Sequence, residues 1–259
     1  MPVITLTTDL GTRDHYTGTV KGELMKAIPN VQIVDISNEI EPFNIMHGAF
    51  VLKNSYHHFP KGTCHLIGVN TLNEEGMSFL VVLNEGFIFI GPDNGFFGLM
   101  WEELPSTIFR IREDAAEMFS TLPIKDVFVL AAKHLLAGGD PEEIADKIST
   151  YRQSALGRPM INNNFIRCSI IYFDRFENAI LNLTREEFEK AAHNRKFVVH
   201  FKRFDDIDAV SENYYSVPES EKLILFNSAG YLEIAINKGN AKGLLNLSVG
   251  DLVQIEFKG

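Results

Sequence analysis

The sequence predicts two domains: an α/β N-terminal domain with a mainly parallel sheet, and a smaller, β-rich C-terminal domain. In the first half of the chain, apolar runs with β propensity alternate with segments of helical periodicity, as they do where helices connect parallel strands. In the second half, short strand-like runs dominate. The segment 154–164 between them contains Gly157, Pro159 and three consecutive asparagines, a composition typical of a linker. We therefore assign residues 1–153 to the first domain and 165–259 to the second.

Strands are predicted in the first domain where β-branched and aromatic residues cluster. They cover Val3–Thr7, Val31–Ile36, Thr63–Val69, and Phe79–Leu83 with Phe87–Ile90 as a hairpin turned at Asn84-Glu85-Gly86. Helices are predicted at Asp14–Ile28, at Ile45–Phe59 and from Asp140 onward. In the first helix, Val20, Leu24 and Ile28 share one face. The third begins with Asp140 as N-cap and Pro141 at the first helical position.

The second domain is predicted to contain short strands and one short helix. The strands are Phe165–Phe173, Lys196–Phe201, Lys222–Phe226, Tyr231–Ile236 and Leu252–Phe257. The helix begins at Thr184, because Thr184 and Glu187 have the spacing of a capping box.

The composition restricts the class of ligand. The chain has 259 residues, of which 45% are hydrophobic and 22% charged, and this predicts a folded globular protein rather than a disordered one. It has 24 Lys and Arg against 34 Asp and Glu, a formal net charge of −10. Such a chain is a poor candidate for binding nucleic acid or an anionic membrane surface. An anionic small ligand remains open, because a pocket can differ in charge from the whole chain.

Common cofactor and metal motifs are absent from the sequence. It contains no G-x-x-x-x-G-K-[ST], G-x-G-x-x-G, G-x-S-x-G or H-E-x-x-H segment, so we expect no metal and no bound cofactor. Cys64 and Cys168 each lie between apolar residues, and we expect two reduced thiols in the core. The first residues lack the features of a signal peptide, and no apolar run approaches the ~18 residues of a spanning helix. We therefore expect a cytoplasmic protein.

Two polar clusters in the first domain are candidate binding loops. The TTDLG segment at residues 7–11 lies at the carboxyl end of the first strand, where open α/β sheets bind ligands. Asp9 in this segment is able to accept two hydrogen bonds from a ribose diol, or to act as an N-cap or turn carboxylate. The GPDNG segment at residues 91–95 is a strong turn sequence, and a structural turn explains it as well as a binding loop does.

Two further clusters lie in the second domain. The YFDRFEN segment at residues 172–178 places a carboxylate, an aromatic ring and an amide after a strand. Asn178 has the groups to pair with an adenine edge and Phe176 to stack on it, although an ordinary hairpin turn also explains the segment. The NSAGYLEIAIN segment at residues 227–237 begins with polar residues that either hold a carboxylate or form a turn before a strand.

Taken in order, the four clusters resemble the S-adenosylmethionine (SAM) hydroxide adenosyltransferase family, which includes the fluorinase and chlorinase enzymes. The resemblance runs through TTDLGTRDHYTGTVKGEL, IVDISNEIEPFNI, HHFPKGT, GPDNG, FDRFENAILNLT and NSAGYLEIAINKGNA. It implies an α/β N-terminal domain, a C-terminal β-barrel-like domain and a homotrimer. It also implies a SAM ligand that is cleaved at C5′ of the ribose to methionine and adenosine or an adenosine derivative.

The resemblance implies that most ligand-holding positions are present. The substrate-binding candidates are Asp9 for the ribose, Asp14 and Asp174 for the methionine ammonium group, Ser228 for the methionine carboxylate, Asn178 for the adenine, Phe43 and Tyr214 as aromatic walls, and Asn70, Phe176 and Glu233 beside them. Glu177 stands where the family usually has glycine.

The residues that activate water in hydrolytic family members are not matched. By the resemblance, the family's Asp falls on Asn70, its Arg on or next to Met77, and its His on Pro123. Asn70 can hold a water molecule but cannot take its proton at neutral pH, and Glu74 or Glu75 remains open as a substitute base. We therefore expect an adenosyltransferase or hydrolase of this family with weak or altered activity. The alternatives are a non-catalytic adenosine or SAM binder, and a relative in fold alone.

Overall fold

The computed structural model describes residues 1–71, 77–101, 103, 105, 107–113, 120–155, 157–201 and 206–258. The chain divides into two compact units, Met1–Ala155 and Leu156–Gly259, which we call domain 1 and domain 2. The division falls within the segment predicted as the linker. Part of that segment, Met160–Ile161, forms a short strand β8 that pairs with a strand of domain 2.

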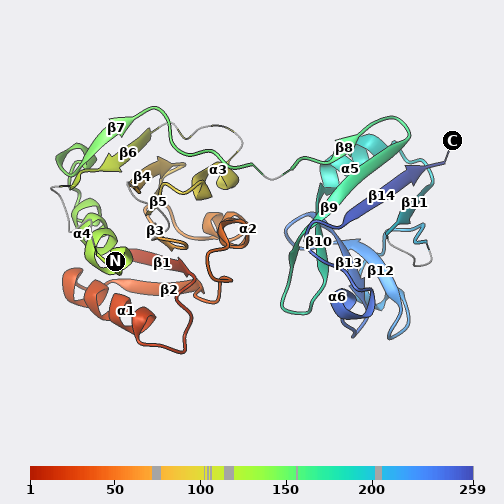
Figure 1. The fold of residues 1–259 in the computed structure, drawn as a ribbon, viewed down its shortest axis with the longest axis horizontal. Helices are drawn as coiled ribbons and strands as arrows, with labels where there is room; N and C mark the ends of the chain where they lie inside the picture. The colour runs from red at the N-terminus through yellow and green to blue at the C-terminus, as the bar shows by residue number, and fades with distance from the viewer. Residues whose placement is uncertain are drawn as a thin grey trace. The chain divides into compact units, whose positions relative to one another are not determined.

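Domain 1 is built on a seven-stranded sheet of order β2-β1-β3-β5-β4-β6-β7 (Figure 1). Its strands are β1 (Val3–Thr8), β2 (Gln32–Ser37), β3 (Cys64–Gly68), β4 (Phe79–Asn84), β5 (Phe87–Pro92), β6 (Thr107–Ile111) and β7 (Ala145–Ile148). The pairs β2–β1, β1–β3 and β3–β5 are parallel, whereas β5–β4, β4–β6 and β6–β7 are antiparallel. The prediction of a mainly parallel sheet therefore holds for only half of the pairs, and the sheet is mixed.

The change of direction has a local cause. The predicted hairpin of β4 and β5 is present, and its turn residues Glu85 and Gly86 have φ of 50° and 82°. Two positive φ values in a two-residue loop match the right-handed twist of the flanking strands. The loop reverses the chain, so β4 runs against β5, and β6 and β7 extend the antiparallel half.

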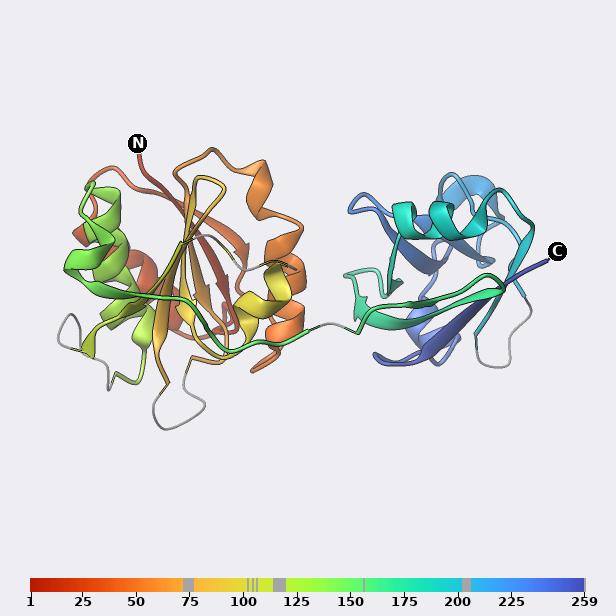
Figure 2. The ribbon, with the colours of Figure 1, turned by 90° about the horizontal axis from the view of Figure 1, so that it is seen from above.

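Helices cover both faces of this sheet (Figure 2). One face carries α1 (Tyr16–Ala27), the π-helical turn η3 (Ile124–Phe128) and α4 (Val129–Leu136); the other carries α2 (Ile45–Lys53), the 3-10 turn η1 (Tyr56–His58) and α3 (Phe96–Met100). The helix predicted from Asp140 is only one 3-10 turn, η4 (Pro141–Glu143), although the Asp140 side chain does cap it. The helix predicted at Ile45–Phe59 ends early, because Asn54 and Ser55 donate side-chain hydrogen bonds to the carbonyls of Phe50 and Val51.

Domain 2 has an antiparallel sheet of order β11-β14-β9-β10-β13-β12, with β8 added on β9. Its other elements are β9 (Phe165–Phe173), β10 (Ala179–Thr184), α5 (Arg185–Ala192), β11 (Phe197–His200), η5 (Tyr214–Ser216), β12 (Lys222–Phe226), β13 (Tyr231–Ile236), α6 (Ala241–Leu244) and β14 (Leu252–Phe257). The predicted capping box is present: the Thr184 hydroxyl accepts from Glu187 N, and the Glu187 carboxylate accepts from Thr184 N.

This second sheet curls into a half-barrel. The short segment 207–211 contacts both of its edge strands: Ile207 pairs with Val199 in β11, and Val210 pairs with Ile224 in β12. Apolar residues from β9, β10, β13 and β14 fill the space enclosed by the sheet and α5. Residues of the β9–β10 turn and of η5 line the same cavity in this domain.

The two cysteines are free and buried, as predicted, and burial raises the pKa of the Cys168 thiol to about 12. Within the described part of the chain, the structure contains no helix with the length and apolar character needed to cross a membrane.

Candidate ligand-binding site

One candidate binding region lies at the carboxyl edge of the parallel strands of domain 1. Thr8 in β1 pairs with Gly68 in β3, so the residues that follow the two strands emerge side by side. Asp9 Oδ2 accepts hydrogen bonds from the backbone N–H groups of Asn70 and Phe43, each at 3.0 Å. Phe43 and Asn70 have φ of 67° and 50°, so this one oxygen holds two residues in the left-handed conformation.

The other half of the Asp9 carboxylate is available to a ligand. Oδ1 of this half-buried residue has no hydrogen-bond partner among the described residues. The Phe43 side chain beside it is 72% exposed. A carboxylate oxygen next to an exposed aromatic ring suits a hydroxylated ligand that carries an apolar ring. Asp14, which belongs to the same predicted cluster, is exposed in the bend before α1.

Asn94 holds this loop in place; the sequence predicted its segment as either a structural turn or a binding loop. Its Nδ2 donates to the carbonyls of Val69 and Asn70 at 3.0 Å each, and its Oδ1 accepts from Phe96 N. Asn94 is buried, so these bonds fix the backbone on which Asn70 is carried. The sequence signal was the GPDNG turn itself, which leads directly into α3.

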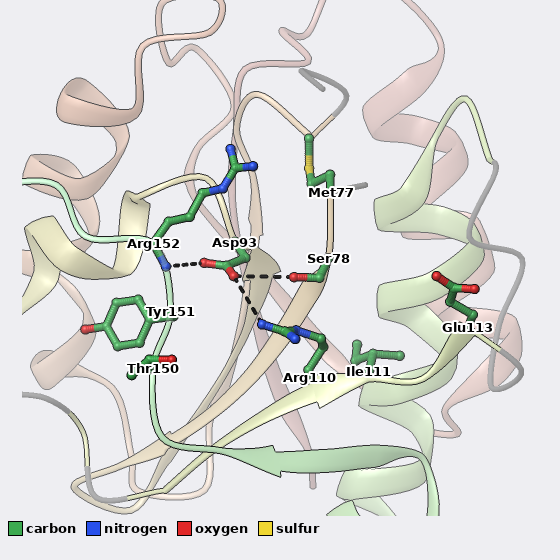
Figure 3. Close-up of a pocket in the computed structure, with 9 residues that line it drawn as sticks. All are labelled: Met77, Ser78, Asp93, Arg110, Ile111, Glu113, Thr150, Tyr151 and Arg152. Atoms are coloured by element: carbon green, nitrogen blue, oxygen red, sulfur yellow. Dashed lines mark hydrogen bonds and ion pairs between the residues drawn. The ribbon is translucent and has the colours of Figure 1, made fainter. Parts of the chain in front are cut away.

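A pocket of about 580 Å³ lies beside Asp93 in domain 1 (Figure 3). Asp93 Oδ1 accepts from Arg152 N at 2.7 Å, and Oδ2 accepts from Ser78 Oγ at 3.3 Å and lies 3.9 Å from the Arg110 guanidinium. The pocket is lined by Met77, Ser78, Asp93, Arg110, Ile111, Glu113, Thr150, Tyr151 and Arg152. None of the residues predicted to hold the ligand lines this pocket. Through its bonds to Ser78, Arg110 and Arg152, Asp93 connects the ends of β4, β5 and β6 with the segment after β7.

The three positions that the family resemblance predicts to replace the water-activating residues, Asn70, Met77 and Pro123, have no titratable side chain. Pro123 is buried at the start of the π-helical turn. The next residue, Ile124, packs so closely on β3 that a Cβ on Gly68 would lie 2.8 Å from its Cδ1, which places this turn near Asn70. Met77 is partly buried against the core of domain 1. Glu74 and Glu75, the candidate substitute bases, lie outside the described residues.

A separate candidate binding region is the β9–β10 turn of domain 2. Asp174 Oδ1 accepts from the backbone N–H groups of Phe176 and Asn178, and Oδ2 accepts from Asn178 Nδ2 at 3.1 Å. Glu177 completes the turn with φ of 60°, a left-handed conformation that glycine adopts more easily. Asp174 thus orients the Asn178 amide from within its own turn.

A cavity of about 460 Å³ opens beside this turn. Its lining residues are Phe176, Asn178, Tyr214, Tyr215, Ile236, Asn237, Lys238 and Gly239. Three aromatic rings and two amide side chains line it, and such groups are suited to a flat, polar-edged ring such as a purine. Phe176, Asn178 and Tyr214 were predicted from the sequence, whereas Tyr215 and the 236–239 turn were not.

Glu233 and Ser228 are placed differently from each other. Glu233 is 2% exposed on β13 and accepts from Tyr214 Oη at 2.8 Å and Asn227 Nδ2 at 3.2 Å. Burial raises the pKa of the Glu233 carboxyl, and the two hydrogen bonds oppose this effect. Ser228 is exposed in the β12–β13 turn. Glu233 therefore faces protein groups, while Ser228 faces solvent.

Among the described residues, no group of three or more His, Cys, Asp or Glu side chains is arranged to hold a metal ion.

Comparison of the sequence with models of known protein families identifies the family of this chain. The model of the SAM hydroxide adenosyltransferase N-terminal domain matches residues 4–145, and that of the C-terminal domain matches residues 168–254. The chain belongs to the SAM hydroxide adenosyltransferase family.

Relatives of this family member match it over nearly their whole length. The protein named (R)-S-adenosyl-L-methionine hydrolase in Methanocaldococcus jannaschii is 29% identical, over 99% of this chain and 97% of that protein. A fluorinase from an Actinoplanes species is 23% identical, over 98% and 97%. The crystal structure of an uncharacterized conserved protein from Thermotoga maritima has a TM-score of 0.87 and 27% identity, covering 98% of this chain and 99% of that one.

Proposed function

We propose that this protein binds SAM and cleaves it at C5′ of the ribose, releasing methionine and adenosine or an adenosine derivative. One observation carries the proposal: each domain contains a preorganised group suited to one part of the nucleoside. Domain 1 has the free oxygen of Asp9 beside Phe43. Domain 2 has the Asn178 amide in an aromatic cavity. The names of the relatives support the same chemistry.

The proposed contacts follow from these geometries. Asp9 Oδ1 accepts from the ribose hydroxyls, and Phe43 covers the nucleoside. Asn178 pairs with the adenine edge between Phe176 and Tyr214. Asp14, Asp174 and Ser228 hold the methionine part, as the family resemblance implies. Asn70 lines the approach to C5′, because its backbone is bonded to Asp9.

The leaving group of this reaction does not need a proton from the protein. The nucleophile forms a bond to C5′, the C5′–S bond breaks, and its electron pair returns to sulfur. The sulfonium thereby leaves as the neutral thioether of methionine, without an acid or a cofactor. The protein must hold the nucleophile in line and remove its water shell. When the nucleophile is water, its proton must also go to a base.

The nucleophile is where this chain departs from hydrolytic relatives. Asn70, Met77 and Pro123 supply no base and no charge. A preformed anion needs no base, so these changes reduce hydrolysis more than attack by an anion. The same changes favour a second candidate function, a non-catalytic adenosine or SAM binder, which keeps the ligand contacts and lacks turnover.

We also propose a homotrimer. In this arrangement the Asp9 part of one subunit and the Asn178 part of a neighbouring subunit act on one ligand. The measurement is light scattering coupled to size-exclusion chromatography, with and without adenosine. A monomer under both conditions would contradict the trimer.

The decisive experiment is incubation of the purified protein with (R)- and (S)-SAM, followed by chromatography of adenosine and methionine. Calorimetry with adenosine and SAM is run on the same preparation. Equal release of adenosine and methionine supports cleavage. Binding without release supports the non-catalytic alternative. If the protein shows no heat of binding and releases no product at up to millimolar ligand, both SAM cleavage and non-catalytic binding are ruled out.

A further inference from the structure

Glu233 is a buried carboxylate next to the domain 2 cavity but not part of its lining. It is 2% exposed, and the described residues that donate to it are both neutral: Tyr214 through its hydroxyl and Asn227 through its amide. Tyr214, in contrast, lines the cavity. Glu233 therefore reaches the cavity only through Tyr214.

Tyr214 lies on an element that does little to fix its ring. It begins η5, a single 3-10 turn of three residues whose N-terminus is capped by Asn213. The backbone bonds of one such turn hold the main chain but leave the side-chain torsions free. The bond from Tyr214 Oη to Glu233 Oε1, at 2.8 Å, connects the far end of the ring to β13 in the sheet.

Tyr215 gives an internal comparison. It is adjacent in sequence and lines the same cavity, yet it is 81% exposed, whereas Tyr214 is 38% exposed. The Tyr215 hydroxyl has no hydrogen-bond partner among the described residues. One tyrosine of the pair is anchored by a carboxylate, and the other is not.

In the hydrogen bond between Tyr214 and Glu233, the tyrosine hydroxyl is the donor. Burial, then the hydrogen bond and charge of Glu233, raise the pKa of the Tyr214 hydroxyl, so it stays protonated and donates. The hydrogen bonds from Tyr214 and Asn227 favour the ionised form of Glu233 against its burial. A hydrogen bond to an ionised acceptor is shorter and stronger than one between neutral groups.

We propose that Glu233 is a positioning residue that holds the Tyr214 ring as a fixed wall of the cavity, so that the cavity receives the flat base of the ligand without first ordering this side chain. The role of the base rests on the proposed function. The fixed ring rests on the contacts alone. Fixing a wall in advance removes an ordering cost from binding.

The test is a double-mutant cycle on adenosine binding, measured by calorimetry with Tyr214→Phe, Glu233→Gln and the double variant. Each single change is expected to weaken binding roughly 5- to 30-fold, the scale of losing part of a charged hydrogen bond. The double variant should be no weaker than the weaker single variant, because both changes remove one bond. Glu189→Gln, an exposed carboxylate on α5 of the same domain that does not line the cavity, is the matched control and should stay within about twofold of the wild type. Losses that multiply in the double variant would overturn the proposal.

A second readout needs no ligand. The protein is labelled with 3-fluorotyrosine, and the Tyr214 and Tyr215 signals are assigned in fluorine NMR by their absence from Tyr214→Phe and Tyr215→Phe. In Glu233→Gln the Tyr214 signal should shift or broaden while the Tyr215 signal stays in place. An unchanged Tyr214 signal would refute the positioning role. If the wild type binds no adenosine, the proposed function fails, and the NMR result alone decides the role of Glu233.

Discussion

Substitutions of Asp9 distinguish its bonds to the loop backbone from its proposed contact with the ligand, because each involves a different carboxylate oxygen. Oδ2 accepts hydrogen bonds from Phe43 N and Asn70 N, whereas Oδ1 has no hydrogen-bond partner among the described residues. Asp9→Ala removes both oxygens. Asp9→Asn keeps one oxygen that can still accept from the two N–H groups, and it replaces Oδ1 with an NH₂ donor.

The expected magnitudes follow from the count of bonds. A hydrogen bond to a charged group contributes about 1.5–3 kcal/mol, and half-burial lowers this figure. Asp9→Ala should therefore lower the free energy of unfolding by about 2–4 kcal/mol, and Asp9→Asn by about 1 kcal/mol. Both should weaken adenosine binding by about 1.5–3 kcal/mol, roughly 10- to 150-fold, with Asp9→Asn at the lower end.

Two assays distinguish these contacts: urea unfolding measures the contribution of the loop bonds to stability, and calorimetry measures the contribution of the proposed ligand contact to adenosine affinity. Glu23→Gln is the charge control, since Glu23 pairs only with Lys26 on the surface of α1 among the described residues. It should leave both values within about 0.5 kcal/mol of the wild type. Asp9→Asn with wild-type affinity for adenosine would refute the ligand contact and leave Asp9 with its loop bonds alone.

Three further predictions follow. The Asn70→Asp, Met77→Arg, Pro123→His triple variant should release adenosine from SAM faster than the single variants combined, because base and charge act as a unit; robust wild-type hydrolysis would contradict this. Asp93→Asn should lower the free energy of unfolding by about 1.5–3 kcal/mol in urea titrations. The control Asp146→Asn, which removes an exposed carboxylate paired with Arg112, should lower it by less than about 1 kcal/mol. Burial lowers the pKa of His65 from 6.5 to about 4, so the unfolded state takes up its proton first and stability falls as pH drops from about 6.5 to about 4. The loss should reach about 3 kcal/mol and be reduced in His65→Gln, and equal pH dependence of unfolding in the two proteins would exclude His65 as its source.

The sequence predicted those parts of the fold that local patterns determine. The β4–β5 turn and the Thr184 capping box were readable because a few adjacent residues define each. The mixed sheet was not, because β6 and β7 join it through pairings with partners far along the chain. The 3-10 turn after Asp140 carries a proper cap, but β7 begins only two residues after it ends.

The site shows the same division. Asp9 and Asn178 were identifiable because they follow strands in polar clusters. The support behind them was not: Asn94 holds the Asn70 backbone, and Asp174 orients Asn178 from within its turn. Tyr215 and the 236–239 turn line the cavity together with Asn178, from which both are far apart in the sequence. Glu233 was identified as a candidate, but its burial and its partners depend on the three-dimensional structure.

The loop contacts of Asn70 are made by its backbone, so they do not depend on the identity of its side chain. The backbone N–H bonds Asp9, and the carbonyl accepts from Asn94. Both bonds need only a residue that tolerates a φ of 50°, a conformation in which Asn and Asp are enriched. Asn70→Asp should therefore be nearly neutral for folding. Met77→Arg and Pro123→His are harder changes, because Met77 packs on the core and Pro123 is buried with φ of −56° at the start of its turn. Introducing a carboxylate at Asn70 thus requires only a side-chain change on an unaltered backbone, whereas introducing charged groups at Met77 and Pro123 requires repacking of their surroundings.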